Sequence, residues 1–226
     1  MGGGAPIRDS MRYETGTMTR TKICGITTPG DAAAAADAGA DAIGVVFHEP
    51  SPRCVNTQQA AAIVAALPPF VTAVGLFLDA PAERVREVLA HVPLGLLQFH
   101  GREEAAFCRS FGRGYMKAVG MAGGSDLAAM AAAYPDAKAL LADSHGTGEA
   151  GGTGRTFAWE CLPADRAYRL VLAGGLDPDN VAEAVRVTGP DAVDVSSGVE
   201  TSPGCKDAAR IQRFIEEVRR GDRNET

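Results

Sequence analysis

The chain has 226 residues and a formal net charge of −6; 46% of its residues are hydrophobic and 6% are aromatic. This length suits one large α/β domain, and the negative charge argues against nucleic acid or an anionic membrane as the main partner. A phosphorylated small molecule remains a suitable substrate, because proteins often build phosphate sites from backbone N–H groups.

Short apolar runs alternate with alanine-rich amphipathic segments along most of the chain. Residues 1–19 begin with a glycine run and are expected to form a disordered tail, and 222–226 to form a second, short tail. Strands are expected at 21–24, 42–47, 71–78, 94–99, 115–119, 138–142, 168–173 and 192–195. Helices are expected near 29–38, 56–66, 81–91, 102–111, 125–134, 177–187 and 205–220, with a short helical turn near 156–161.

Repeated strand–helix units of this length predict an α/β fold, a single (β/α)8 TIM barrel over 20–221. A doubly wound open parallel sheet is the alternative. The longest apolar run, 60–78, contains Pro68 and Pro69, so it predicts a helix, a break and a strand and not a membrane span.

The five cysteines are widely spaced and form no Cys-x-x-Cys pair. This pattern suggests neither a zinc site nor a disulfide framework. No secretory signal is visible in the first residues, so we expect a reducing, cytoplasmic location.

The reactive groups of a TIM barrel lie on the loops that follow its strands. Cys24 ends the first expected strand, and Asp143 directly follows the sixth. A thiol and a carboxyl at one barrel mouth form a candidate pair of general base and general acid. The alternatives are an inert core cysteine and an aspartate that only caps a helix or solvates a loop.

Two further polar side chains follow other strands. Arg53 lies behind a Ser-Pro turn after the second strand, where a held guanidinium suits a substrate carboxylate, although it could also be a surface residue. His100 follows the fourth strand, and a structural hydrogen bond is as plausible there as a substrate contact.

Glycine-rich turns follow the last three strands, where TIM barrels commonly bind phosphate. Glycine lets the backbone approach phosphate oxygens closely, and the backbone N–H groups donate to them. The alternative is a set of tight turns without a ligand. The candidate phosphate-binding residues are Gly154, Gly174, Gly175, Ser196, Ser197 and Gly198.

These residues together resemble the phosphoribosylanthranilate isomerase family of tryptophan biosynthesis. The resemblance covers about 21–220, and its motifs are KICGIT at 22–27, SPRCV at 51–55, VGLF at 74–77, LLQFHG at 96–101, GGTGRTFAW at 151–159, LAGGLDPDNV at 172–181 and DVSSGVETSPGCKD at 194–207. It implies a (βα)8 barrel without cofactor or metal. It also implies that Cys24 is the general base, Asp143 the general acid and Arg53 the group that holds the anthranilate carboxylate, with phosphate on the last two glycine turns.

Two positions depart from the family pattern: Arg155 stands for the usual lysine and Ala158 for the usual aspartate. Both lie outside the acid–base pair. The insert at 144–150 lengthens the same loop, which we expect to be mobile.

The implied reaction is an Amadori rearrangement. Protonated Asp143 would donate to the furanose ring oxygen, and the Cys24 thiolate would remove the proton from C2′ of the sugar. These roles lead us to expect the pKa of the thiol below, and that of the carboxyl above, its ordinary value.

Two rival functions stay open. Another sugar-phosphate isomerase or epimerase would rely on paired carboxylates or metal ligands at the strand ends. A non-catalytic phosphate-binding barrel would keep the glycine turns without needing both reactive groups. Whether the chain is a monomer or a homodimer is not decidable from the sequence.

Overall fold

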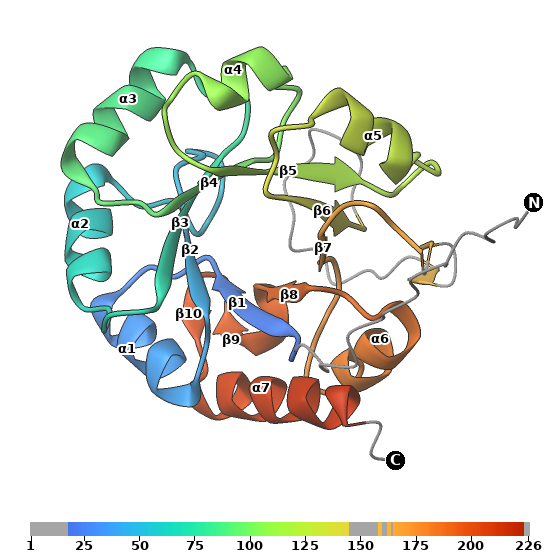
Figure 1. The fold of residues 1–226 in the computed structure, drawn as a ribbon. Coiled ribbons are helices and arrows are strands. Elements are labelled where there is room, and N and C mark those ends of the chain that lie inside the picture. Colours follow the sequence, from blue (N-terminus) through green and yellow to red (C-terminus); the bar gives the residue numbers. More distant parts are fainter. Residues whose placement is uncertain (1–17, 145–157, 160–161, 164, 224–226) are drawn as a thin grey trace, which may run out of the picture.

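The computed structural model describes residues 18–144, 158–159, 162–163 and 165–223. Eight parallel strands close into a barrel in sequence order, and the helices surround it (Figure 1). The TIM-barrel prediction is therefore confirmed. The strands of the barrel are β1 Arg20–Cys24, β2 Ala42–Val46, β3 Thr72–Phe77, β4 Leu96–Phe99, β5 Tyr115–Gly120, β6 Ala139–Asp143, β7 Leu170–Leu172 and β8 Ala192–Val195.

The helices on the outside begin and end where local chemistry favours it. Asn56 caps α2 through a capping box, in which its side chain accepts from Gln59 N and the Gln59 side chain accepts from Asn56 N. Gly39 ends α1 in the left-handed region with φ 99°. The helices are α1 Pro29–Ala38, α2 Thr57–Ala65, α3 Ala82–His91, α4 Ala105–Arg109, α5 Leu127–Ala133, α6 Val181–Thr188 and α7 Ala208–Asp222.

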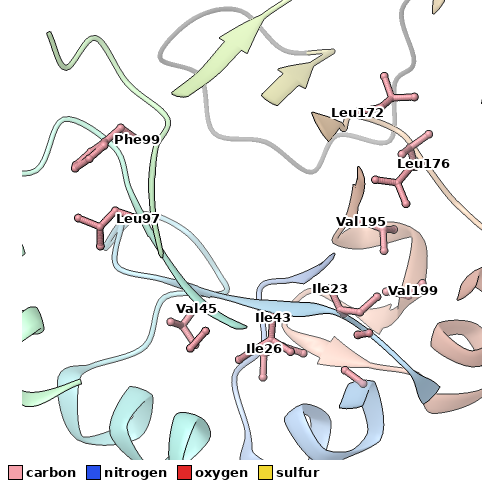
Figure 2. Packing of buried hydrophobic residues seen from close by; sticks show 14 of the residues in the cluster. Ile23, Ile26, Ile43, Val45, Leu97, Phe99, Leu172, Leu176, Val195 and Val199 are labelled. Atoms are coloured by element: carbon pink, nitrogen blue, oxygen red, sulfur yellow. The ribbon is translucent and has the colours of Figure 1, made fainter. Parts of the chain in front are cut away.

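Side chains on each strand alternate between the barrel interior and the layer under the helices. The larger buried cluster fills that outer layer; Figure 2 shows Ile23, Ile43 and Val45 of β1 and β2 among its members. A smaller cluster packs separately, with Val74, Met116, Ala118, Leu141, Val171 and Ala173. Lys22 and Cys24 flank Ile23, which packs in the outer layer, so both point into the barrel.

The segment after β8 differs from the expected strand–helix sequence. A one-turn helix, η2 Ser197–Val199, leads into a short antiparallel pair, β9 Glu200–Ser202 and β10 Cys205–Lys206. The helix expected from 205 therefore begins only at Ala208, where Asp207 caps it by accepting from Ala209 N and Arg210 N.

Another expected boundary also moved. The helix expected from 177 begins at Val181, because Asp177 Oδ1 accepts from Asp179 N and Asn180 N in a turn. Most of the turn expected at 156–161, the insert after Ser144, and the residues 1–17 and 224–226 lie outside the described residues.

Candidate active site

One pocket opens at the carboxyl ends of the barrel strands. Most of the predicted site residues line it, namely Cys24, Arg53, Asp143, Gly174, Gly175, Ser196 and Ser197. Three residues outside the predicted set also line it, namely His48, Gln98 and Asp194. His100 contacts Asp143 from the end of β4. Gly154 lies outside the described residues.

Cys24 ends β1 and is 6% exposed at the pocket. Two glycines make room around it. A Cβ on Gly44 of β2 would lie 2.8 Å from Cys24 Sγ, closer than Cβ contacts normally come. Gly25 has φ 76°, and a Cβ there would overlap Arg53 Cδ and lie 3.0 Å from Ser196 Oγ. The Cys-Gly sequence therefore lets three parts of the site approach one another.

A buried ion pair lies beside the thiol. Lys22 Nζ donates to Asp194 Oδ1 at 2.8 Å, and both side chains are less than a tenth exposed. Burial acts to lower the pKa of Lys22, but Asp194 and Cys24 raise it and prevail. For Asp194 burial prevails: it raises the pKa of the carboxyl despite the opposing effect of Lys22.

The expected low pKa of the Cys24 thiol is wrong for the structure. Burial raises the pKa of the thiol above its ordinary value, and the nearby charge of Lys22 offsets this only in part. The protonated thiol is therefore the dominant form of Cys24 at neutral pH.

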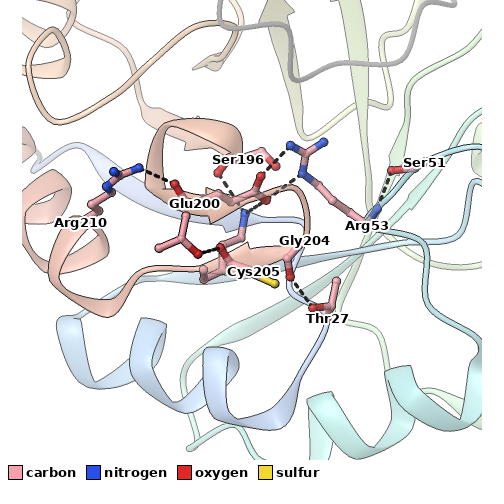
Figure 3. Close-up of polar contacts among 10 residues, drawn as sticks. Thr27, Ser51, Arg53, Ser196, Glu200, Gly204, Cys205 and Arg210 are labelled. Atoms are coloured by element: carbon pink, nitrogen blue, oxygen red, sulfur yellow. Dashed lines mark hydrogen bonds and ion pairs between the residues drawn. The ribbon is translucent and has the colours of Figure 1, made fainter.

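Arg53 is held more firmly than the Ser-Pro turn alone would hold it. Its backbone N donates to Ser51 Oγ at 3.2 Å, and its guanidinium forms a bidentate pair with Glu200 of β9 (Figure 3). Nε donates to Glu200 Oε1 at 2.8 Å and Nη2 to Oε2 at 2.7 Å. Lys206 of β10 adds a third contact, with Nζ 2.8 Å from Glu200 Oε1.

This Arg53–Glu200–Lys206 cluster changes how a substrate carboxylate would be bound. The Nε edge of the guanidinium is already occupied by Glu200, and neither contact uses Nη1. Burial acts to raise the pKa of Glu200, but the hydrogen bonds from Arg53 and Lys206 prevail and lower it. Glu200 therefore stays ionised and keeps the guanidinium in place, leaving the Nη1 side for a ligand.

Asp143 ends β6 and is joined to a short polar chain. Its Oδ2 lies 3.5 Å from His100 Nε2, and His100 Nδ1 lies 3.1 Å from Gln98 Nε2. The contact with Gln98 holds the His100 ring so that its Nε2 faces Asp143. This assigns His100 a contact with the candidate acid.

The candidate phosphate turns lie on the side of the pocket formed after β7 and β8. Gly174 and Gly175 have φ 84° and 68°, in the left-handed region that favours glycine. Gly198 has no room for a side chain, because a Cβ would overlap the Leu176 carbonyl oxygen. Ser196 Oγ is buried without a hydrogen-bond partner among the described residues, so it can serve a ligand.

Sequence reasoning missed Lys22, Asp194, Glu200 and Lys206. A signal existed for the first two: a charged residue inside an otherwise apolar barrel strand must point inward and find a partner. Glu200 and Lys206 lie in the hairpin after β8, which the sequence analysis did not predict, since it expected a helix from 205.

Within the described part of the chain, no three His, Cys, Asp or Glu side chains are arranged to hold a metal ion.

Fold and pocket together define a TIM-barrel enzyme with a thiol, a carboxyl and a fixed arginine at one mouth. Comparison with known proteins specifies the family. The family model for N-(5′-phosphoribosyl)anthranilate (PRA) isomerase matches residues 21–217. The chain therefore belongs to this family of isomerases.

The similarity between this chain and individual relatives extends over nearly the whole length of each relative. The chain is 55% identical to N-(5′-phosphoribosyl)anthranilate isomerase of Neisseria meningitidis serogroup B, covering 87% of this chain and 94% of that protein. It is also 55% identical to the Pseudomonas aeruginosa enzyme, covering 92% and 98%. The crystal structure of the Thermotoga maritima enzyme is 43% identical, with a TM-score of 0.81 over 89% of this chain and 98% of that one.

Proposed function

We propose that the protein converts N-(5-phosphoribosyl)anthranilate to 1-(2-carboxyphenylamino)-1-deoxyribulose 5-phosphate in tryptophan biosynthesis, with Cys24 as general base and Asp143 as general acid. The observation that carries the proposal is that both side chains line one pocket of a barrel that belongs to this isomerase family. No cofactor takes part in these steps.

The rearrangement needs two proton transfers at opposite ends of a short substrate segment. Protonated Asp143 donates to the furanose ring oxygen as the bond from this oxygen to C1′ breaks, and the ring opens to a protonated Schiff base. The thiolate of Cys24 then takes the proton from C2′, and the C2′–H electron pair forms the enol-amine, which tautomerises to the aminoketone. The cationic Schiff base makes C2′–H more acidic and favours the thiolate, which compensates for the raised pKa of the free thiol.

His100 supports the acid in this scheme. Once Asp143 has given up its proton, its carboxylate accepts from the Nε2–H that the contact with Gln98 orients toward it. A hydrogen bond to the charged form stabilises that form, so it lowers the barrier to donation.

The rest of the pocket supplies anion sites for the two ends of the substrate. The Nη1 side of Arg53, which the contacts with Glu200 do not use, donates hydrogen bonds to the anthranilate carboxylate. The phosphate binds at Gly174, Gly175, Ser196, Ser197, Gly198 and, on the loop outside the described residues, Gly154. A solved relative 40% identical to this chain is described as a complex with reduced 1-(o-carboxyphenylamino)-1-deoxyribulose 5-phosphate, which supports a phosphorylated small-molecule substrate.

We place the protein in the cytoplasm, where reduced cysteines persist. Cys24, Cys54, Cys108 and Cys205 are all free thiols. In the part of the chain that the structure describes, no helix has both the length and the apolar character to span a bilayer. Neither a nucleic-acid partner nor a membrane partner is proposed.

Turnover of phosphoribosylanthranilate, followed by the loss of its fluorescence, tests the proposal. We expect Cys24→Ser and Asp143→Asn each to lower kcat by roughly 10²–10⁴-fold, the usual contribution of a general acid or base. Both variants should still bind product. Binding of product without turnover by the unmodified protein would instead support the phosphate-binding barrel, and a variant with kcat within a few-fold of normal would remove that residue from the mechanism.

A further inference from the structure

The buried pair of Lys22 and Asp194 has no role in the proton transfers above. Lys22 is 4% exposed and Asp194 is 8% exposed. Such a pair adds little or nothing to stability compared with apolar residues of similar size, because removing both charges from water is costly. Its presence directly beside a reactive thiol therefore calls for a functional reason.

Strand geometry places Lys22 next to Cys24. The two residues are i and i+2 on β1, so their side chains point to the same interior face. The Cβ position of Gly44, on the neighbouring strand β2, is 2.8 Å from Cys24 Sγ and 3.1 Å from Lys22 Nζ. Asp194 is paired with Lys22 in the register of β1 with β8, and its Oδ1 holds the ammonium from the other side.

The charges around the thiol favour one additional negative charge. Three cations, Lys22, Arg53 and Lys206, are grouped with two anions, Asp194 and Glu200, in this part of the barrel. The five ionised side chains thus carry one net positive charge. A thiolate at Cys24 makes the group neutral, provided that Asp143, across the pocket, is protonated as its role as acid requires.

We propose that Lys22 is a positioning residue for the general base: its ammonium, held in place by Asp194, stabilises the thiolate of Cys24. The role in turnover rests on the proposed function, but the effect on the thiol does not. The charged groups around Cys24 are Lys22 from its own strand, Arg53 from the loop after β2, Asp194 from β8 and Lys206 from β10. Lys22 and Lys206 lower the pKa of the thiol, whereas burial and Asp194 raise it.

The test measures the thiol directly. Cys24 is alkylated with iodoacetamide across a pH series, and the modified peptide that carries it is quantified by mass spectrometry in wild type, Lys22→Met and Lys22→Arg. Because only the thiolate reacts, the rate at neutral pH reports its population. We expect Lys22→Met to react about tenfold more slowly or worse, with its profile displaced toward alkaline pH, and Lys22→Arg to restore much of the rate.

A double variant guards against misfolding. Lys22→Met alone leaves Asp194 as an unpaired buried charge, which can prevent folding. Lys22→Met combined with Asp194→Leu leaves neither charge. It should also react more slowly than wild type, because the Lys22 charge acts more strongly on the thiol than that of Asp194. Circular dichroism confirms the fold of each variant.

The outcomes separate this inference from the proposed function. An unchanged alkylation profile in folded variants that lack Lys22 would overturn the inference, whatever their activity. A displaced profile in a protein that does not turn over phosphoribosylanthranilate would support the inference and defeat the proposed function. With both correct, the ascending limb of kcat/KM against pH moves in the same direction as the alkylation profile, a change that a purely structural role of Lys22 does not produce.

Discussion

Glu200→Gln is the most informative single substitution outside the acid–base pair. The change keeps the shape of the side chain and removes its charge. In wild type, Glu200 accepts two hydrogen bonds from Arg53 and one from Lys206, all of 2.7–2.8 Å. The side chain of Arg53 is 10% exposed, that of Glu200 4% and that of Lys206 1%. The substitution therefore leaves two cations facing each other in a buried site.

The burial sets the expected magnitude. Removing one partner of a buried ion pair typically costs about 3–5 kcal/mol, because the remaining charge is left uncompensated. Comparable surface pairs contribute only about 0–1 kcal/mol. We expect Glu200→Gln to lower the free energy of unfolding by about 3–5 kcal/mol, a large fraction of the roughly 5–15 kcal/mol of a typical domain. KM should rise as well, since Arg53 is no longer held at the pocket.

Urea denaturation followed by circular dichroism measures the change in the free energy of unfolding. The exposed pair of Arg109 and Asp136, with side chains 58% and 52% exposed, supplies the matched control. Asp136→Asn should change the free energy of unfolding by less than about 1 kcal/mol. A loss for Glu200→Gln no larger than that of Asp136→Asn would refute the idea that this cluster organises the mouth.

The effect also has a definite pH dependence. Arg53 and Lys206 lower the pKa of Glu200 in the folded protein, so its contribution to stability is full above the unfolded pKa of about 4.3 and is lost as the pH falls through the folded value. The difference in stability between wild type and Glu200→Gln should therefore be largest at neutral pH and shrink in acid. A difference that stays constant down to the acid limit would argue against an ionic origin.

Three other substitutions test the remaining parts of the pocket. Arg53→Ala should weaken binding of anthranilate-bearing ligands by about 1.5–3 kcal/mol, measured by calorimetry, and equal affinity would exclude the carboxylate contact. A bulky side chain at Gly175 should raise KM more than it lowers kcat, because it blocks the phosphate turn; unchanged KM would contradict this. Gly44→Ala should displace Cys24 Sγ and lower kcat, with little change in the Ki of product-like inhibitors. A normal kcat would show that the thiol tolerates the shift.

Several features of this protein followed from local patterns alone. The alternation of apolar runs with amphipathic segments predicted a parallel sheet covered by helices and favoured the closed barrel over an open doubly wound sheet, because parallel strands buried on both faces give continuous apolar runs. The rule that reactive groups follow the strands then placed Cys24, Arg53 and Asp143 at one mouth, and all three line the pocket. The motifs at the strand ends indicated the isomerase family, which the family model matches over 21–217.

Other features depend on contacts between residues far apart in the chain. Glu200 meets Arg53 across 147 positions, and Asp194 meets Lys22 across 172. No local sequence pattern encodes such pairs. Closure of the barrel brings β8 beside β1 and so joins Asp194 to Lys22, and the hairpin after β8 carries Glu200 to Arg53. The direction of the Cys24 pKa shift is also a feature that depends on distant residues. It depends on how burial competes with surrounding charges, and both are properties of the folded barrel, so the sequence could name the thiol but only the tertiary structure could give its electrostatic surroundings.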